Sequence, residues 1–326
     1  MKKFWSFLLV AVLCMGLLAG CGGGAAVEEE EIDYPTSTIT AICPWSAGGG
    51  TDTFLRAICA ATEPILGQTI TVSNTTGGGG ATGHGAIIAA EPDGYTIGMI
   101  TFELNSLPPQ GLFEFTYEDL DPLLRLNMDA AAITVPIDAP YDTLEAFLEY
   151  CKAHPGEVTV GNAGPGSVWH LAAGVAEQEC GVTFNHIPYD GAAPAVTDLA
   201  GGHIDAVAVS SAEVLSQVKA GTMKILAVMA EERNPNFPEV PTFTEEGYNV
   251  VFGTWRGLAV PTGTPDEIKA ILVEAFTEAY EDADFQELAT SLGLGLAYQN
   301  TEDFKAFLAE NAASVENTMK TLGLIE

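Results

Sequence analysis

Residues 38–61 read TITAICPWSAGGGTDTFLRAICAA and decide how the chain begins to fold. The β-branched run at 38–43 predicts a strand, and the apolar spacing over 53–61 predicts a helix. The glycines between them form a strand-to-helix turn, where unpaired backbone N–H groups and the helix dipole favour an anion. A phosphate-binding loop has Lys after its glycines, whereas Gly50-Thr51-Asp52 has none. We therefore expect a small carboxylate at this turn rather than a nucleoside triphosphate.

The rest of the chain repeats the alternation of strand and helix. Short β-rich runs separated by helical stretches of about ten to fifteen residues are typical of an α/β fold, with helices on both faces of a parallel or mixed sheet. We expect strands at 38–43, 69–73, 96–101, 131–135, 157–160, 184–187, 204–209 and 224–228, then a strand-like run at 250–260 and a purely helical tail. Helices are expected to begin near Thr51, Ala81, Thr143, Val168, Ala192, Ala212, Pro265 and Asp303. This order predicts two α/β lobes, with chain crossings near 127–131 and 251–257 and a ligand cleft between the lobes.

The first 36 residues predict export and anchoring. Lys2 and Lys3 precede an apolar stretch, which makes residues 1–20 a signal peptide. Leu18-Ala19-Gly20-Cys21 resembles the lipobox of bacterial lipoproteins, so Cys21 is expected to carry lipid; an incidental cysteine after an ordinary signal peptide is the alternative. Residues 21–36 lack apolar periodicity and predict a disordered tether. We expect a lipoprotein on the outer face of the membrane or in the periplasm.

The composition excludes some partners. With 12 Lys and Arg against 44 Asp and Glu, the net charge is −32, so nucleic acid is not expected as a partner. Screening over about 8 Å still allows local dipoles to bind an anion. Four cysteines outside the signal and lipobox show no C-x-x-C spacing. Buried free thiols are favoured, while a Cys43–Cys59 or a Cys151–Cys180 disulfide stays open.

Two further glycine-rich turns follow expected strands. Gly78-x-Gly80-x-x-Gly83 matches a dinucleotide-binding fingerprint, with Glu103 twenty residues beyond, but tight turns and close helix packing are the simpler explanation. In residues 161–170, GNAGPGSVWH, Ser167 is expected to cap a helix. Its hydroxyl and the neighbouring N–H groups are also expected to face the cleft opposite the first turn. Two opposed anion-binding turns suit a ligand with two polar ends.

Patterns for catalysis and metal binding are weak. The chain has no Gly-x-Ser-x-Gly and no His-Glu-x-x-His motif, and its five histidines lie sixteen or more residues apart, so we expect no metal site and no cofactor. His170 stands out because it falls in the first turn of a helix after a glycine loop. Arg256, on the second crossing, is either a clamp for a ligand carboxylate or, as we favour, part of a structural ion pair. An enzyme on this fold would rely on Cys43 as its nucleophile.

Six motifs in order resemble the substrate-binding proteins of tripartite tricarboxylate transporters, also called Bug receptors. They are Pro44-Trp45-x-Ala47-Gly48-Gly49-x-x-Asp52, Asn74-x-x-Gly77-x-Gly79-Gly80-x-x-Gly83, Pro92-Asp93-Gly94-Tyr95-Thr96, Pro188-Tyr189-x-Gly191-x-x-Pro194-Ala195-x-x-Asp198-Leu199-x-Gly201-Gly202, Pro238-x-Val240-Pro241-Thr242-Phe243-x-Glu245-x-Gly247 and Trp255-x-Gly257-Leu258-x-x-Pro261-x-Gly263-Thr264-Pro265. The resemblance covers essentially the whole chain after the signal peptide.

The resemblance implies a bilobed periplasmic-binding-protein fold of type II, with residues 37–128 and 254–326 in lobe 1 and 129–253 in lobe 2. It implies a monomeric extracytoplasmic receptor that captures a di- or tricarboxylate or a related organic acid and delivers it to membrane permease subunits. A sensing co-receptor for a membrane signalling protein is the alternative. Backbone amides of two loops would hold the ligand, and the implied ligand-binding residues are Trp45, Ser46, Ala47, Gly48, Gly49, Asp52, Ala163, Gly164, Ser167, His170, Tyr189 and Asp205. Arg256 replaces a residue that is often aromatic in the family, and we add it to the ligand-binding candidates as the clamp considered above.

Overall fold

The computed structural model describes residues 32–326, and Tyr34–Glu326 form one compact unit. The predicted signal peptide and the predicted lipidation site at Cys21 lie outside the described residues. The hydroxyl of Tyr34 donates to the carbonyl of Gly94 over 2.6 Å, and the backbone of Thr36 donates to the hydroxyl of Tyr95 over 3.0 Å. Residues 34–36, which the sequence assigned to the tether, therefore contact the folded unit. Among the described helices, none is long and apolar enough to cross a membrane.

The unit contains strands and helices throughout its length. The strands are β1 (Ile39–Cys43), β2 (Ile70–Asn74), β3 (Thr96–Thr101), β4 (Leu120–Pro136), β5 (Thr159–Asn162), β6 (Asn185–Pro188), β7 (Ala206–Ser210), β8 (Met223–Val228), β9 (Gly253–Pro261) and β10 (Leu296–Gln299). The α-helices are α2 (Gly50–Leu66), α3 (Ala81–Ile88), α4 (Glu103–Ser106), α5 (Leu144–Ala153), α6 (Val168–Cys180), α7 (Ala192–Ala200), α8 (Ser211–Lys219), α9 (Asp266–Glu281), α10 (Ala283–Ser291) and α11 (Thr301–Thr321). Short 3₁₀ turns occur at Gly78–Gly80, Pro108–Gln110 and Tyr117–Asp119.

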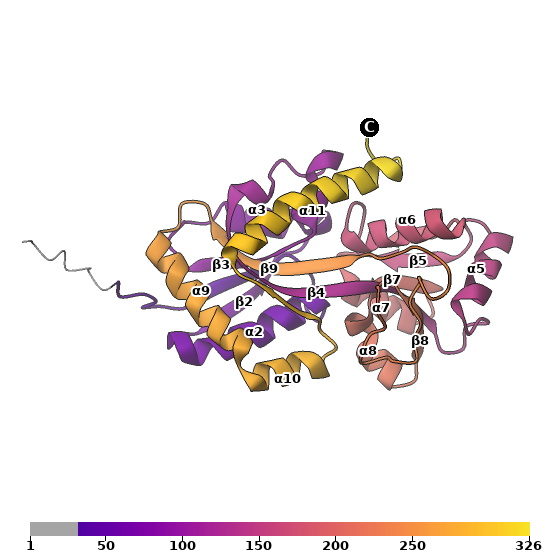
Figure 1. The fold of residues 1–326 in the computed structure, drawn as a ribbon, viewed down its shortest axis with the longest axis horizontal. Helices are drawn as coiled ribbons and strands as arrows, with labels where there is room; N and C mark the ends of the chain where they lie inside the picture. Colours follow the sequence, from indigo (N-terminus) through magenta and orange to yellow (C-terminus); the bar gives the residue numbers. More distant parts are fainter. Residues whose placement is uncertain (1–31) are drawn as a thin grey trace, which may run out of the picture. The chain divides into compact units, whose positions relative to one another are not determined.

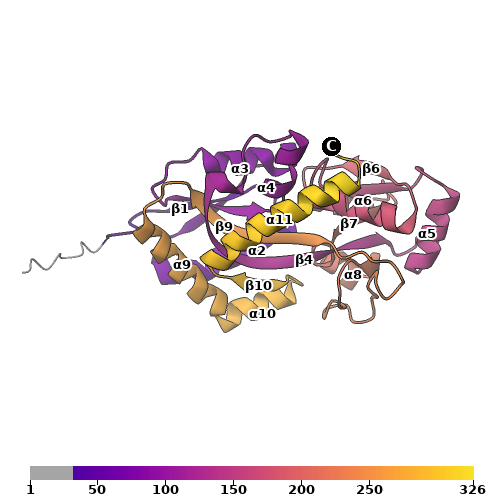
Figure 2. The same cartoon turned by 45° about the horizontal axis from the view of Figure 1, so that its top comes forward.

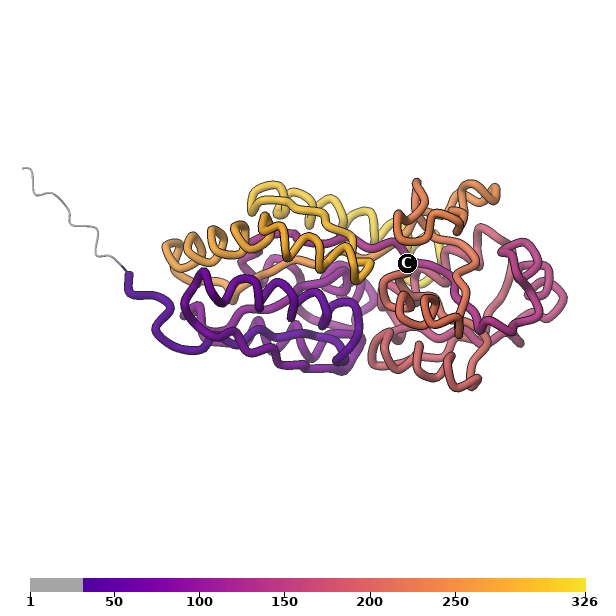
Figure 3. The backbone as a smooth tube through the Cα atoms, turned by 90° about the horizontal axis from the view of Figure 1, so that it is seen from below, coloured from indigo at the N-terminus to yellow at the C-terminus, as the bar shows by residue number. Residues whose placement is uncertain are grey.

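The strands form one mixed sheet in the order β2-β1-β3-β9-β4-β7-β5-β6, with β8 and β10 also paired to β4. We call the first lobe the part built on β1, β2, β3 and β10 with helices α2–α4 and α9–α11. The second lobe is built on β5–β8 with helices α5–α8. Strand β4 pairs with β9 up to Ala130 and with β7 and β8 from Ala131 onward, so it runs through both lobes (Figure 1). Figure 3 shows residues 140–250 gathered at one end of the unit.

Helices cover both faces of the sheet, as predicted. In the first lobe, α3 and α11 lie on one face and α2, α9 and α10 on the other (Figures 1 and 2). Helix α2 packs against α9 and α10, while α11 packs against β4 and α4. The chain end after α11 reaches the second lobe, where Leu322 approaches Gly174 of α6. The mixed α/β fold class is therefore confirmed.

The structure corrects several expected elements. β4 begins at Leu120 instead of 131, because Pro122 and two register shifts interrupt the alternation that identifies a strand. The tail is not purely helical, since β10 pairs with β4. Helices α4 and α10 were also not expected. The expected starts of α2, α3, α6 and α7 agree with the structure to within one residue.

Buried cysteines and close-packed glycines confirm two of the simpler expectations. Cys43, Cys59, Cys151 and Cys180 are all buried free thiols. In the second glycine run, a Cβ on Gly83 of α3 would meet the Cα of Pro44 and lie 2.6 Å from the carbonyl oxygen of Thr75, which explains why α3 has glycine where it packs against the start of the first loop.

Candidate functional site

The first glycine loop joins β1 to α2, and hydrogen bonds to the Asp52 carboxylate stabilise it. The Asp52 carboxylate accepts hydrogen bonds from the Gly48 N–H at 2.9 Å, from Arg56 Nε at 2.9 Å and from Asn74 Nδ2 at 2.8 Å. Burial raises the pKa of Asp52, but these hydrogen bonds outweigh it and leave the pKa below its usual range. Asp52 therefore fixes the shape of the loop instead of facing a ligand.

The second loop joins β5 to α6 and is also stabilised by side-chain hydrogen bonds. The Ser167 hydroxyl accepts from the His170 N–H at 3.3 Å, which confirms Ser167 as the N-cap of α6. The Gly164 N–H donates to Asn162 Oδ1 at 3.0 Å, and the Gly166 N–H donates to His170 Nδ1 at 3.3 Å. Several loop N–H groups are thus paired within the chain.

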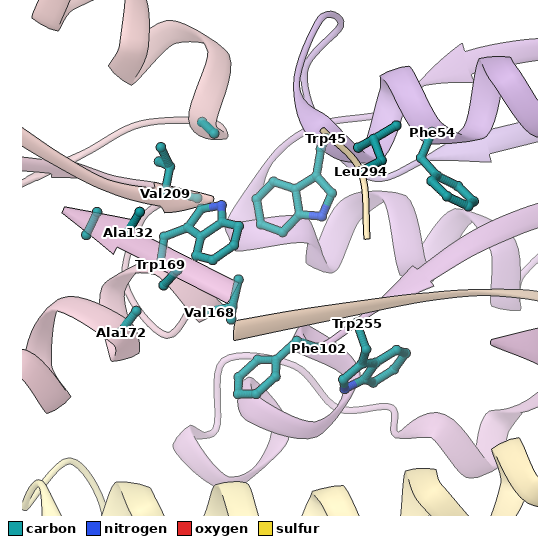
Figure 4. Close-up of a cluster of buried hydrophobic side chains, with 14 of the residues drawn as sticks. Trp45, Phe54, Phe102, Ala132, Val168, Trp169, Ala172, Val209, Trp255 and Leu294 are labelled. Atoms are coloured by element: carbon teal, nitrogen blue, oxygen red, sulfur yellow. The ribbon is translucent and has the colours of Figure 1, made fainter. Parts of the chain in front are cut away.

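The two loops face each other across a small cavity of about 20 Å³, room for one water-sized group. Figure 4 shows Trp45 from the first loop and Trp169 from α6 in the region between the lobes. The residues that line the cavity are Trp45, Ser46, Gly49, Gly50, Thr51, Glu103, Thr254 and Arg256 from the first lobe, and Ala163, Val168, Trp169, Ala192 and Glu213 from the second.

Each lobe contains a glutamate that accepts a hydrogen bond from the N-terminus of a helix in the other lobe. Glu213 follows Ser210 in the capping box of α8, where its Oε2 accepts from the Ser210 N–H at 3.0 Å, while Oε1 accepts from the Gly50 N–H of α2 at 3.1 Å. Conversely, Oε1 of Glu103 in α4 accepts from the Val168 N–H of α6 at 2.9 Å. The chain's own carboxylates thus occupy the N-termini of α2 and α6, where a ligand carboxylate was expected.

Both glutamate side chains are buried, and burial shifts the pKa of each. Burial raises the pKa of Glu103, and hydrogen bonds from the Thr101 hydroxyl and the Val168 N–H oppose the shift. Burial also raises the pKa of Glu213, opposed mainly by the positive charge of Arg256. The raised pKa values therefore reflect the removal of solvent around the two carboxyl groups, which disfavours their ionised forms.

Arg256 belongs to a buried ion pair, the alternative that the sequence favoured. Its Nη1 lies 2.5 Å from Asp129 Oδ2 and also donates to Asn127, and its Nε donates to Thr51 Oγ1 at 2.9 Å. Its Nη2 lies 4.0 Å from Glu213 Oε1. The Arg256 side chain is 2% exposed, lines the cavity and links β9 to β4 and α2.

The predicted ligand-binding residues fall into three groups. Five of them line the cavity: Trp45, Ser46, Gly49, Ala163 and Arg256. Gly164 and Tyr189 line an adjoining open groove of about 660 Å³, which shares Ala163 with the cavity. Four others line neither the cavity nor this groove. Ala47 and Gly48 are exposed on the first loop, and Asp52 and Ser167 form hydrogen bonds that stabilise the loops.

His170 and Asp205 lie away from the cavity. His170 lines a separate groove beside His186 and Leu322. Asp205 accepts from the Thr159 N–H at 2.8 Å, at the start of β5, whereas the cavity lies at the other end of that strand. We therefore remove both from the candidate site: Asp205 lies at the opposite end of β5, and His170, although it accepts from Gly166 of the second loop, lines a groove other than the cavity. The residues that the sequence did not single out as ligand-binding are Gly50, Thr51, Glu103, Val168, Trp169, Ala192, Glu213 and Thr254.

Cys43, the one thiol expected beside the first loop, is poorly suited to nucleophilic chemistry. It is fully buried in β1, and burial raises its pKa to about 12. A thiol is nucleophilic as the thiolate, which this environment disfavours. Within the described residues, no group of three or more His, Cys, Asp or Glu side chains is arranged to hold a metal ion.

Comparison with known proteins identifies the family. The model of the tripartite tricarboxylate transporter family receptor matches residues 54–324. The chain belongs to this family. It is 30% identical to the UPF0065 protein in the gbd 5′ region of Cupriavidus necator, over 94% of both chains, and 30% identical to the protein BugT of Bordetella pertussis, over 93% of both. The family is one of extracytoplasmic solute-binding receptors, with the type II-like periplasmic-binding-protein fold that the sequence predicted.

Solved structures extend the comparison to ligands. A TctC solute-binding protein from Polaromonas, without ligand, is 43% identical, with a TM-score of 0.65 over 88% of this chain and 99% of that one. The periplasmic binding protein BugD is 29% identical, with a TM-score of 0.86 over 90% and 99%. MatC from Rhodopseudomonas palustris, solved with malate, is 26% identical, with a TM-score of 0.82 over 87% and 99%.

Proposed function

We propose that this receptor captures a small organic carboxylate between its two lobes and delivers it to a membrane permease. The observation that carries the proposal is the cavity, which is lined by the β1–α2 loop of the first lobe and by the β5–α6 loop of the second. A ligand that contacts both loops links the lobes, so its binding favours the closed arrangement.

The relatives support a carboxylate as ligand. MatC was solved with malate, and its TM-score of 0.82 exceeds the 0.65 of the ligand-free Polaromonas protein, although the latter has the higher sequence identity. We attribute this reversal to a difference in the angle between the lobes, because closure moves one lobe as a body. The two lobes of this chain would then be closed, as in a receptor with bound ligand.

The remaining details of the proposal come from the sequence. Cys21 would carry the lipid anchor, and residues 21–33 would act as its tether. Residues 37–128 with 254–326, and residues 129–253, would move as the two lobes of a monomer. The permease partner follows from the family, whose receptors serve a tripartite transporter.

A thermal-shift screen tests the proposal. Mono-, di- and tricarboxylates are added to the purified receptor, with sugars and divalent cations as controls. At least one carboxylate at about one hundred times its Kd should stabilise the protein by about 2.7 kcal/mol, because a ligand that binds only the folded state adds to stability. Stabilisation by sugars or metal ions, with no response to any carboxylate, would contradict the proposal.

A further inference from the structure

Two histidines lie beside the second loop but outside the cavity. His170 is on α6 and His186 is on β6, and the centroids of their rings are 4.9 Å apart. Both rings line a groove of about 360 Å³ between α6 and the chain end at Leu322 (Figure 2). Each ring also accepts a hydrogen bond at the second loop or at the strand end that leads into it. The proposed function gives this loop a ligand-binding role in which neither ring takes part.

The backbone of the second loop determines which nitrogen of His170 carries the proton. The Gly166 N lies 3.3 Å from His170 Nδ1. A backbone N–H can only donate, so Nδ1 is the unprotonated nitrogen that accepts. His170 is therefore neutral in this structure, with its proton on Nε2.

Asn162, the last residue of β5, determines the state of His186 by the same reasoning. Its Oδ1 accepts from the Gly164 N–H at 3.0 Å, so its Nδ2 is the donating end of the amide. That Nδ2 lies 3.1 Å from His186 Nδ1, which must therefore accept. The proton of His186 is on Nε2, which donates to Glu177 Oε2 at 3.0 Å.

Protonation of either ring would place a donor opposite a donor. A proton on His186 Nδ1 would face Asn162 Nδ2 at 3.1 Å, and turning the amide to present its oxygen would take that oxygen away from Gly164. A proton on His170 Nδ1 would face the Gly166 N–H at 3.3 Å. In both cases the second loop loses a hydrogen bond to one of its glycines.

The two glycines depend on these hydrogen bonds for their conformation. Gly164 and Gly166 have φ values of 93° and 77°, in the left-handed region. Glycine populates this region about as readily as the region of negative φ, so its own backbone does not select one conformation. The side-chain acceptors therefore stabilise the observed shape of the loop.

Few charged groups surround the two rings. Among the described residues that line the groove, Glu177 and the two histidines are the titratable ones, and the segment after α11 contributes none. Burial lowers the pKa of His170 below 6.5, the neighbouring His186 lowers it further, and Glu177 opposes the shift. Glu177 accepts from His186 Nε2 whether that ring is neutral or protonated, so protonation of His186 alters the contact of its Nδ1.

We infer that His170 and His186 are positioning residues for the second loop, which keeps its ligand-binding conformation only while both rings are neutral. The inference rests on the proposed function, which makes this loop one side of the ligand site. Residues 163, 168 and 169 of the loop and of the start of α6 line the cavity. Acidification therefore releases a segment that holds the ligand, and the receptor is built to bind at neutral pH and to lose its grip in acid.

Nuclear magnetic resonance of the receptor without added ligand tests the inference. The sample is acidified from about pH 8 through the range in which histidines titrate. Long-range proton–nitrogen spectra report which nitrogen of each ring is protonated, and amide signals report on Gly164 and Gly166. Both rings should carry the proton on Nε2 at the start. The amide signals of Gly166 and Gly164 should then shift with the same midpoints as the rings of His170 and His186.

His170→Asn and His186→Asn separate positioning from a merely structural role. The side-chain oxygen of Asn reaches the position of Nδ1 and accepts a hydrogen bond without titrating. Each variant should therefore keep the signal of its glycine at neutral pH and hold it on acidification. His170→Ala and His186→Ala remove the acceptor and should shift the same signals already at neutral pH.

His154→Asn is the matched control. His154 Nδ1 faces the carbonyl oxygen of Tyr150 at 2.9 Å and must donate, and the residue follows α5, which contributes nothing to the cavity or to the groove. The loop should keep its wild-type pH profile in this variant. Glu103 accepts from the Val168 N–H and is present in every variant, so a transition caused by its titration would persist in both asparagine variants of the groove histidines.

Three results would overturn the inference. They are a proton on Nδ1 of either ring at neutral pH, glycine signals that stay constant while the rings titrate, and a loop transition that persists in both asparagine variants. The wild-type titration needs no substitution, so it decides the matter even where a variant fails to fold. Because no ligand is added, each of these results leaves the carboxylate function intact, and a receptor that binds no carboxylate would leave the coupling of histidines and loop measurable.

Discussion

At the scale of single residues, charged side chains near the two loops stabilise the conformation of the loops and of the strands beside them. Asp52 holds the first glycine loop through Gly48 and Asn74, and Arg256 ties β9 to Asp129 of β4. Removing one partner of such a buried pair leaves an uncompensated charge, which costs about 3–5 kcal/mol. Glu103 and Glu213 likewise accept hydrogen bonds from the N-termini of α6 and α2.

His84 should give the receptor a stability that falls on acidification. It is fully buried, its Nε2 accepts from the Thr101 N–H at 3.2 Å, and burial lowers its pKa from 6.5 to about 4. The unfolded chain binds a proton on this histidine below pH 6.5, whereas the folded chain does so only near pH 4. Lowering the pH through this window therefore favours unfolding, by roughly 3 kcal/mol for a gap of about 2.5 pKa units.

Denaturant unfolding of the wild type and of His84→Gln across this window measures the effect. Glutamine keeps an acceptor for Thr101 but does not titrate. The wild type should lose roughly 3 kcal/mol more than the variant between pH 7 and pH 4. The raised pKa of the buried glutamates acts in the opposite direction in both proteins, so it cancels in the comparison. Parallel pH profiles would show that His84 is not the titrating group.

The sequence identified the loops of the site but not its glutamates. Gly49 and Ala163 could be predicted because a glycine turn between a strand and a helix is a local pattern. Glu213 also belongs to a local pattern, the capping box with Ser210, but its bond to Gly50 joins residues 163 positions apart. No local signal marks Glu213 or Glu103 as a residue of the cavity among 44 acidic residues.

At the scale of elements, most strands and helices could be predicted where a single periodicity runs without interruption. β7, for example, is five buried apolar or small residues that end at Ser210. β4 could not be delimited, because it changes partners at Ala131 and contains Pro122. β10 has four residues and pairs irregularly with β4, so its existence depends on tertiary contacts that the local sequence does not encode.

The N-cap of α6 should affect both stability and ligand binding. Ser167→Ala removes the acceptor for the His170 N–H and should lower the free energy of unfolding by about 1 kcal/mol. Because Val168 and Trp169 at the start of α6 line the cavity, fraying of this turn should also weaken ligand binding. Chemical unfolding and calorimetric titration of the variant measure the two effects.

Thr143→Ala is the matched control for the cap of α6. Thr143 caps α5 in the same way, with its hydroxyl accepting from the Ala146 N–H at 3.2 Å, but α5 contributes no residue to the cavity. The control should lose a similar free energy of unfolding and keep its ligand affinity. An equal loss of affinity in both variants would mean that global stability, rather than the start of α6, sets the binding strength.

At the scale of the whole unit, the two lobes are joined by β4 and β9 and meet at the cavity. Glu213 and Glu103 each cross from one lobe to a helix start of the other, so closure pairs donors and acceptors that opening would expose to water. The two long strands, which we propose as the hinge, lie beside a contact surface at the carboxyl ends of β1 and β5, the position at which open α/β sheets bind ligands.

A crystal structure of the receptor with the carboxylate that stabilises it most tests this account directly. The account predicts closed lobes, with the ligand in contact with both residues 45–51 of the first loop and residues 163–169 of the second. A ligand held by one lobe alone, or seated in the outer groove beside Tyr189 with the cavity empty, would contradict it.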